Sequence, residues 1–151
     1  MIGRKIYYHL EIDSTQDEAK RLASAGAKEG AVVLAGSQTK GKGKLGRSWI
    51  SPKGGIYLSI ILKPPLKVAH LSEITLLGSL ALARTIRGLY SLPANLKWPN
   101  DVLIHGKKVA GVLTEVGPRD SLVVGIGLNL NNDLASFPPD LQKDSTSLKN
   151  E

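Results

Sequence analysis

Four short apolar segments separated by turn signals constrain the fold of this chain more than any other feature. They span residues 95–98, 102–104, 109–116 and 121–127. Turn-forming residues fill two of the gaps, His105-Gly106-Lys107 and the run from Gly117 to Asp120. Strands joined by turns this short pair as successive antiparallel hairpins. This part of the chain therefore predicts a largely antiparallel sheet.

The N-terminal part predicts three more strands and two helices. The strands cover residues 6–11, 31–35 and 56–62, the last of them closed by Pro64-Pro65. The first helix covers residues 15–25, with Asp13 or Ser14 as its cap and Gly26 at its end. The second covers residues 71–89, and its middle, ITLLGSLALA, carries no charge on any face. A helix that is apolar all round is a buried one, so we expect other elements to cover it on more than one side.

Length and composition indicate one globular domain. The chain has 151 residues and is 42% hydrophobic, enough for a single core over residues 1–151. It has no cysteine, which excludes disulfides, cysteine nucleophiles and cysteine metal sites and is compatible with the cytoplasm. No run is long enough to be a signal peptide or to cross a membrane. The tail beyond Asn131 is polar, and the fold class is α+β, a mixed sheet backed by helices.

Positive charge is concentrated in one acid-free stretch. The net charge is +7, and residues 30–72 contain neither Asp nor Glu. That stretch holds seven cations: Lys40, Lys42, Lys44, Arg47, Lys53, Lys63 and Lys67. Such a segment predicts an anionic ligand, and nucleic acid, a nucleotide phosphate and an acidic protein are all candidates.

The predicted loop over residues 37–55 contains a G-x-G-x-x-G spacing at Gly41, Gly43 and Gly46. A dinucleotide-binding turn would open a helix, whereas Ser48-Trp49-Ile50-Ser51-Pro52 follows here. We therefore interpret it as a flexible cationic loop in which Lys42, Lys44 and Arg47 meet phosphates. A solvated basic loop is the alternative, and Trp49 is either a lid over a ligand or part of the core.

Three further segments carry chemistry. Lys97-Trp98-Pro99-Asn100-Asp101 places a cation, an amide and a carboxylate around a rigid corner, suited to an anionic ligand and a metal, or to a plain turn. Lys108 precedes the small residues Ala110 and Gly111, which leave room for a ligand or merely pack a hairpin. Asn129 follows two glycines, where an amide can read a nucleotide edge or simply end a strand. His9, His70 and His105 have no zinc-site spacing.

Together these segments resemble the biotin protein ligases. The matching stretches occur in family order: DSTQDEA, SQTKGKGKLGRSW, GGIYLS, KWPNDVL, KKVAGVLTE and GIGLNLN. The resemblance covers almost the whole chain. It implies the catalytic-domain fold shared by biotin ligases and class II aminoacyl-tRNA synthetases.

The resemblance also implies a two-step reaction. Biotin and MgATP give biotinyl-5′-AMP, and the acyl group then passes to a lysine of a biotin carboxyl carrier protein of acetyl-CoA carboxylase. By resemblance the catalytic residues are Lys97, Lys108 and Arg47. Those for biotin are Ser14, Thr15, Gln38, Gly41, Lys42, Lys44 and Gly111. Those for ATP are Lys44, Arg47, Trp49, Asn100, Asp101 and Asn129, with Asp101 also on the Mg²⁺ side.

Three departures from the family pattern stand out. Lys42 and Lys44 replace arginines, which keeps the charge and loses the bidentate fork. Gln16 replaces the usual Asn. The chain also ends where family members continue into an SH3-like domain, and it has no N-terminal helix-turn-helix. We therefore expect no DNA partner and no membrane partner, and the resemblance admits a homodimer.

Three other functions remain open from the sequence. One is a non-catalytic relic that binds biotin or biotinyl-AMP. Another is a lipoate-type ligase, disfavoured because the chain has no Arg-x-Ser-Gly-Gly-Gly stretch. The last is a nucleic-acid binder that uses the lysine loop, whose affinity would fall with salt.

Overall fold

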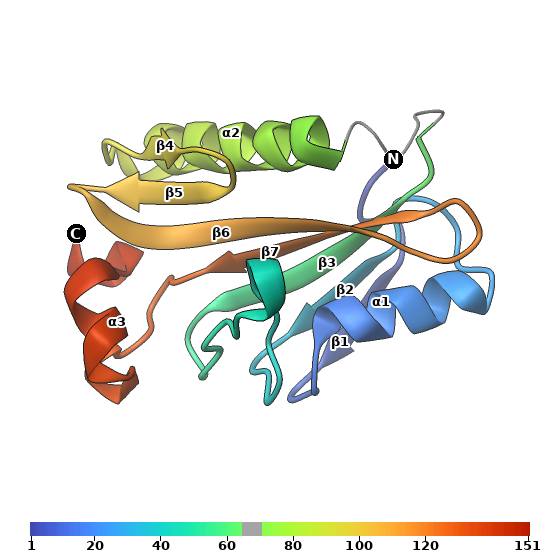
Figure 1. Cartoon of the computed structure of the whole chain (residues 1–151), viewed down its shortest axis with the longest axis horizontal. Coiled ribbons are helices and arrows are strands. Elements are labelled where there is room, and N and C mark those ends of the chain that lie inside the picture. The colour runs from blue at the N-terminus through green and yellow to red at the C-terminus, as the bar shows by residue number, and fades with distance from the viewer. Residues whose placement is uncertain (65–70) are drawn as a thin grey trace.

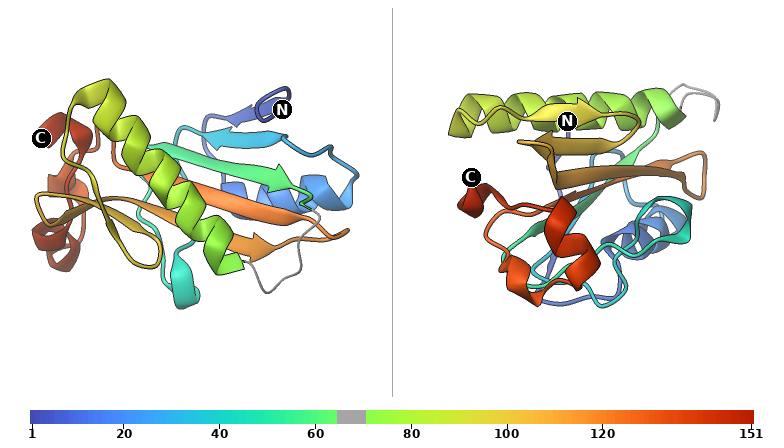
Figure 2. Two further views of the ribbon diagram at one scale, coloured as in Figure 1. Left: turned by 90° about the horizontal axis from the view of Figure 1, so that it is seen from above. Right: turned by 60° about the vertical axis from the view of Figure 1, so that its left-hand side comes forward.

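The protein is built in three layers (Figures 1 and 2). The computed structural model describes residues 1–64 and 71–151, so Pro65, Lys67 and His70 lie outside the described residues. Helix α1 (Thr15–Ser24) covers one face of a central sheet, and helix α2 (Leu71–Tyr90) lies across the other. Ser14 caps α1, since its side chain accepts from the Asp17 N–H at 3.4 Å.

The sheet has seven strands within the described residues, in the order β1-β2-β3-β7-β6-β5-β4. Among these seven strands, β1 and β2 pair in parallel and the other neighbours are antiparallel. The bounds are β1 (Ile6–His9), β2 (Val32–Ala35), β3 (Ile56–Leu62), β4 (Asn95–Lys97), β5 (Asp101–Ile104), β6 (Lys107–Val116) and β7 (Leu122–Leu128). The predicted α+β class with a mixed, largely antiparallel sheet is confirmed.

Two clusters of apolar side chains hold the layers together. On one face, Ala19 and Ala23 of α1 pack on Val33, Ile61 and Val123. On the other, Ala83 and Ile86 of α2 belong to a larger cluster with Val102, Ile104, Val109, Ala110 and Leu128. The small α1 residues let the helix lie close to the sheet, which brings its N-terminus over β3 and β7.

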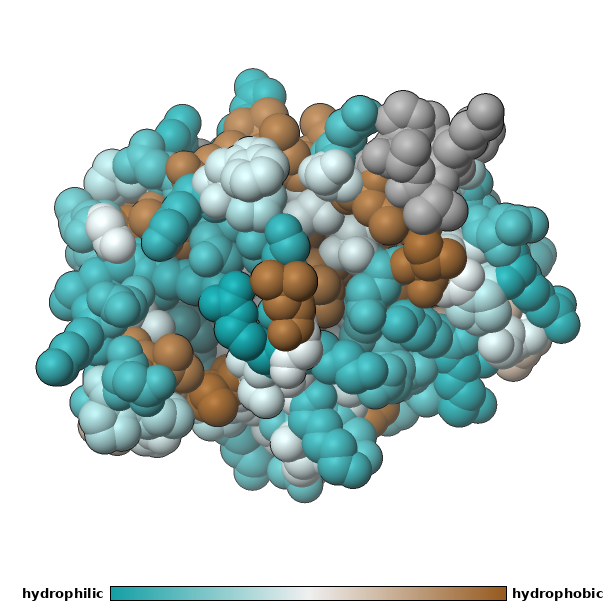
Figure 3. Space-filling view, in the orientation of Figure 1, coloured by the Kyte–Doolittle hydropathy of each residue, from teal (hydrophilic) through white to brown (hydrophobic). Residues whose placement is uncertain are grey.

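The prediction that α2 is buried on more than one side is wrong. Leu77 is 64% exposed and Leu80 39% exposed, and the buried residues of α2 are Ser79, Ala83 and Ile86. Within the described residues the helix packs on β6, β5 and β4, and its three buried residues share one face. Hydrophobic side chains accordingly show along the α2 edge of an otherwise mostly hydrophilic surface (Figure 3).

The polar tail is packed against the domain. It forms helix α3 (Pro139–Asp144) between two short 3-10 turns, and Phe137 and Leu148 are buried. The Leu148 N–H donates to Asn129 O at 3.0 Å, and the Thr146 N–H donates to Lys108 O at 2.8 Å. The tail therefore lies beside the start of β6 and the end of β7. No helix in the described part of the chain is long and apolar enough to cross a membrane.

Candidate active site

A cavity of about 180 Å³ lies on the α1 side of the sheet. Its walls come from the N-terminus of α1, the loop between β2 and β3, strands β3 and β7, the β5–β6 hairpin and the tail. The short turn Lys44–Gly46 stands in front of the sheet at this point (Figure 1). Segments far apart in the chain thus meet around one space.

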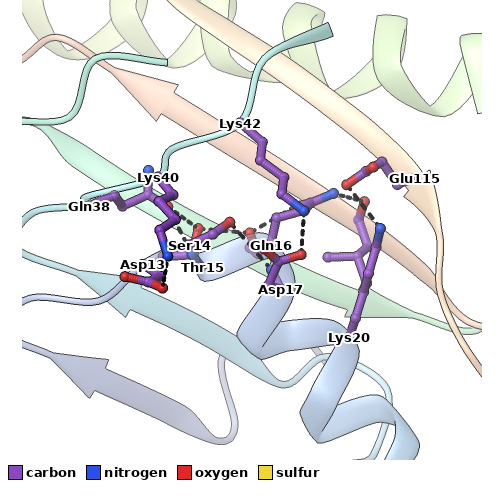
Figure 4. A network of polar contacts seen from close by, with 12 residues as sticks. Asp13, Ser14, Thr15, Gln16, Asp17, Lys20, Gln38, Lys40, Lys42 and Glu115 are labelled. Atoms are coloured by element: carbon purple, nitrogen blue, oxygen red, sulfur yellow. Dashed lines mark hydrogen bonds and ion pairs between the residues drawn. The ribbon is translucent and has the colours of Figure 1, made fainter. Parts of the chain in front are cut away.

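Polar side chains fix one end of the cavity. The Gln38 side-chain carbonyl accepts from the Thr15 N–H at 2.8 Å and from Thr15 Oγ1 at 3.1 Å. The Gln38 amide donates to Ser51 Oγ at 2.9 Å. Ser59, which is fully buried on β3, lies 3.0 Å from Thr15 Oγ1. These side chains satisfy one another's hydrogen-bonding groups, so they form a rigid surface. We call this surface, made by Thr15, Gln38, Ser51 and Ser59, the polar floor; Thr15 and Gln38 are labelled in Figure 4.

Two lysines tie the loop to α1. Lys40 pairs with Asp13 at 2.9 Å, and Lys42 pairs with Asp17 at 2.5 Å (Figure 4). Thr39 also donates to Asp13 at 2.6 Å. The hydrogen bonds from Thr39, which has the larger effect, and from Lys40 lower the pKa of the Asp13 carboxyl. The loop is thereby anchored beside the polar floor.

The loop turns sharply at Leu45 and Gly46, which have positive φ angles of 58° and 74°. The Gly43 N–H donates to Arg47 O at 2.7 Å, and this bond closes the turn. Lys44 and Arg47 both line the cavity. The next regular element after Gly46 is strand β3 and not an α-helix, which agrees with our rejection of a dinucleotide-binding turn.

Trp49 lies flat against β6 and β7. A Cβ atom at Gly127 would stand 2.4 Å from Trp49 Cε2, and one at Gly111 would stand 3.1 Å from Trp49 Cζ3. Gly127 is therefore needed for the indole to lie there, and Gly111 allows it a close approach to β6. Lys108 Nζ is 5.0 Å from the centre of a Trp49 ring, a cation–π contact. The buried indole N–H has no hydrogen-bond partner in the described part of the chain.

Cationic and amide groups occupy the other end. Lys108 Nζ lies 2.7 Å from Asp101 Oδ1, and both side chains are partly buried. Asn129 is 2% exposed; its amide donates to Thr146 O at 3.0 Å, while its Oδ1 has no partner among residues 1–64 and 71–151. A buried acceptor without a partner is costly, so this end is suited to a ligand that donates hydrogen bonds.

Most of the predicted site residues meet at this cavity. Those that line it are Thr15, Gln38, Lys42, Lys44, Arg47, Trp49, Asn100, Asp101, Lys108, Gly111 and Asn129. Three are not among the lining residues. Ser14 is the buried helix cap, Gly41 is packed against Trp49 O and Ser51 Oγ, and Lys97 is exposed on β4.

Several lining residues are not predicted from the sequence. The most informative are Gln16, Ser59, Gly125 and Gly127, together with Phe137 and Leu141 from the tail. A signal was present for some of them. Ser59 is the one small polar residue inside the otherwise apolar strand IYLSIIL, and the glycines at 125 and 127, two residues apart, share one face of β7.

The described residues contain no cluster of three or more side chains that could hold a metal by themselves. Among the residues lining the cavity, Asp101 is the one carboxylate. Mg²⁺ is commonly held by one or two carboxylates together with substrate phosphates. Asp101 fits that limited role.

An α+β domain with a cationic loop over a cavity, polar at its floor, is a small-molecule-binding domain suited to an anionic ligand. Comparison with known proteins identifies the family to which this domain belongs. The sequence profile of the Biotin/lipoate A/B protein ligase family matches residues 10–131, and the chain belongs to this family. The resemblance seen in the sequence is confirmed.

Relatives and solved structures agree with this assignment. The chain is 38% identical to the bifunctional ligase/repressor BirA of Bacillus subtilis, over 98% of this chain and 47% of that one. It is 35% identical to the biotin--[acetyl-CoA-carboxylase] ligase of Mycobacterium tuberculosis, over 87% and 50%. The Aquifex aeolicus biotin protein ligase in complex with biotin and ATP has a TM-score of 0.87 at 36% identity, covering 97% of this chain and 60% of that one. The chain thus spans about half the length of these curated relatives.

Proposed function

We propose that this chain carries the catalytic core of a biotin protein ligase. It would activate biotin with ATP and transfer the biotinyl group to a lysine of a biotin carboxyl carrier protein. The observation that carries the proposal is the cavity itself, which joins a rigid polar floor to a cationic end. Relatives named as biotin--[acetyl-CoA-carboxylase] ligases and a related structure with biotin and ATP support it.

In the first step a biotin carboxylate oxygen attacks the α-phosphorus of ATP, and pyrophosphate leaves. Both reactants are anions, so the reaction needs cations that offset their repulsion and hold them together. Lys44, Arg47 and Lys108 line the cavity and supply that charge. Thr15 and Gln38 hold the biotin ring at the polar floor, while Trp49, Asn100 and Asn129 take the nucleotide.

In the second step the carrier lysine, as a free amine, attacks the acyl carbon of biotinyl-5′-AMP. An amide forms, AMP leaves, and the amine proton passes to solvent. The mixed anhydride hydrolyses in water, so the loop anchored by Lys40 and Lys42 protects it by limiting solvent access. Mg²⁺, held by Asp101 and phosphate oxygens, would neutralise charge on the polyphosphate.

Acetyl-CoA carboxylase is the partner that the relatives' names indicate for the carrier. The cytoplasmic location, the homodimer, and the absence of DNA and membrane partners stay predictions.

The test is calorimetric titration with biotin, followed by ATP·Mg²⁺ with pyrophosphate detection on the same sample. We expect saturable biotin binding and biotin-dependent pyrophosphate release. Lipoate, titrated in place of biotin, tests the lipoate-type alternative. It should give neither binding nor pyrophosphate release at the same concentration. Binding of biotin without pyrophosphate release would contradict the ligase activity and leave a binding module. Absence of binding by a sample that melts cooperatively would overturn the proposal.

A further inference from the structure

Gln16 closes the floor of the cavity from the side of α1. It is the second residue of that helix and is only 3% exposed. Its amide nitrogen donates to Val123 O of β7 at 3.1 Å, and its amide oxygen accepts from Ser59 Oγ at 3.0 Å. The side chain therefore spans from helix to sheet with both ends of its amide fixed, and a ligand cannot push it aside without breaking buried hydrogen bonds.

Gln16 also fills the space above Gly125. A Cβ atom at Gly125 would stand 2.6 Å from Gln16 Oε1, closer than real Cβ contacts allow, and 3.5 Å from Ser59 Oγ. Both residues line the cavity beside Thr15. One volume at the floor is thus shared by the Gln16 amide and the missing side chain of residue 125, so the length of residue 16 sets how deep the cavity is.

We propose that Gln16 is a specificity-determining residue that sets the size limit for the ring end of the substrate. The inference rests on the proposed function, which places the biotin ring at this floor. A ring system with one more methyl group than biotin would meet the fixed amide. Pockets discriminate a single methyl or methylene by roughly 10- to 200-fold.

A pair of variants separates size from hydrogen bonding. Gln16→Asn shortens the side chain by one methylene and keeps an amide, whereas Gln16→Met keeps the length and removes the amide. The substrates are biotin and an analogue methylated on a ureido nitrogen, and the readout is kcat/KM for pyrophosphate release. We expect Gln16→Asn to raise the analogue-to-biotin ratio by about tenfold. Gln16→Met should leave that ratio near the wild-type value, although its stability falls.

A reciprocal substitution tests the shared volume. Gly125→Ala should push the Gln16 amide into the cavity and weaken biotin binding at least tenfold. Adding Gln16→Asn to Gly125→Ala should restore part of that loss, because the shorter side chain vacates the space. A residue with only a structural role would give additive losses instead of rescue.

The outcomes distinguish this inference from the proposed function. If the wild-type protein neither binds biotin nor releases pyrophosphate, the proposed function fails. If wild type is active and Gln16→Asn and Gln16→Met give the same ratio, or the double variant shows no rescue, the role of Gln16 is overturned. Should Gln16→Asn not fold, Gly125→Ala decides with desthiobiotin, which lacks the sulfur and the second ring. Retained desthiobiotin binding supports the size limit, and equal loss of both ligands contradicts it.

Discussion

Lysine at position 44 gives the loop a positive charge but not the bidentate hydrogen-bonding geometry of an arginine. Its ammonium is a compact point charge, whereas an arginine guanidinium donates two parallel hydrogen bonds to a phosphate. Lys44 lines the cavity on the turn that follows Gly43. We expect Lys44→Arg to slow the release of biotinyl-5′-AMP by about fivefold, the equivalent of one additional hydrogen bond near 1 kcal/mol. Single-turnover release from both proteins measures this, and equal rates would refute it.

Asp17 is expected to act on the same intermediate through Lys42. Their ion pair joins the loop to α1, and both side chains are about half exposed. Exposed pairs contribute at most about 1 kcal/mol, so Asp17→Asn should speed release of the adenylate by no more than about fivefold. The matched control is Asp120→Asn, in the β6–β7 turn away from the cavity. A similar acceleration by the control would show that net charge, and not the pair, is responsible.

At this scale the sequence predicted residue types better than their contacts. The lysines, Asn100 and Asp101 were recognisable because charge and amide groups clustered in short segments. The bonds at the polar floor join residues far apart, such as Gln16 to Val123 and Ser59 to Gln16. Local spacing carries no information about such pairs, so Gln16 and Ser59 were missed as parts of the site.

Among the elements, the strands were predictable and the surroundings of α2 were not. Each strand is an apolar run between turn residues, and this signal lies within the segment itself. Burial of a helix depends instead on what packs against it. The sequence of α2 has apolar residues on every face, yet the sheet covers one face only. The packing of the tail depends on its surroundings in the same way, since the segment beyond Asn131 is polar in sequence and yet buries Phe137 and Leu148.

This contrast gives a stability prediction for α2. Ile86 is 1% exposed and lies in the cluster with Val102 and Leu128, whereas Leu77 is 64% exposed. We expect Ile86→Ala to lower the free energy of unfolding by about 2–5 kcal/mol, because it removes buried methyl groups and leaves a cavity. Leu77→Ala should change it by less than about 0.5 kcal/mol. Urea unfolding of the two variants checks this, and similar losses would mean that Leu77 is covered in solution.

For the whole molecule, the pKa shifts predict a stability that is lost at both ends of the pH range. Three carboxyls have a lowered pKa: Asp13 through Thr39 and Lys40, Glu18 through Arg21, and Glu151 mainly through Thr146. A lowered folded-state pKa stabilises the protein above the unfolded pKa, near 4, and this stabilisation disappears as the pH falls through the folded value. The free energy of unfolding should therefore fall more steeply with decreasing pH below about pH 4, which is the acid limb of the stability curve.

The loss of stability at alkaline pH, the alkaline limb of the curve, depends on one buried phenol. Tyr57 is fully buried, donates to Pro52 O at 2.7 Å and accepts from Asn132 at 2.8 Å. Burial raises the pKa of Tyr57, so its contribution is complete below its unfolded pKa, near 10, and is lost as the pH rises through the folded value. Tyr57→Phe should lower the urea midpoint at neutral pH, since it removes two buried hydrogen bonds at about 1 kcal/mol each. It should also lose less stability between pH 9 and 11 than wild type does, while the acid limb of the two proteins stays parallel. Equal alkaline losses would assign that limb to the many lysines, and the buried phenol would then be a structural group without influence on the pH dependence.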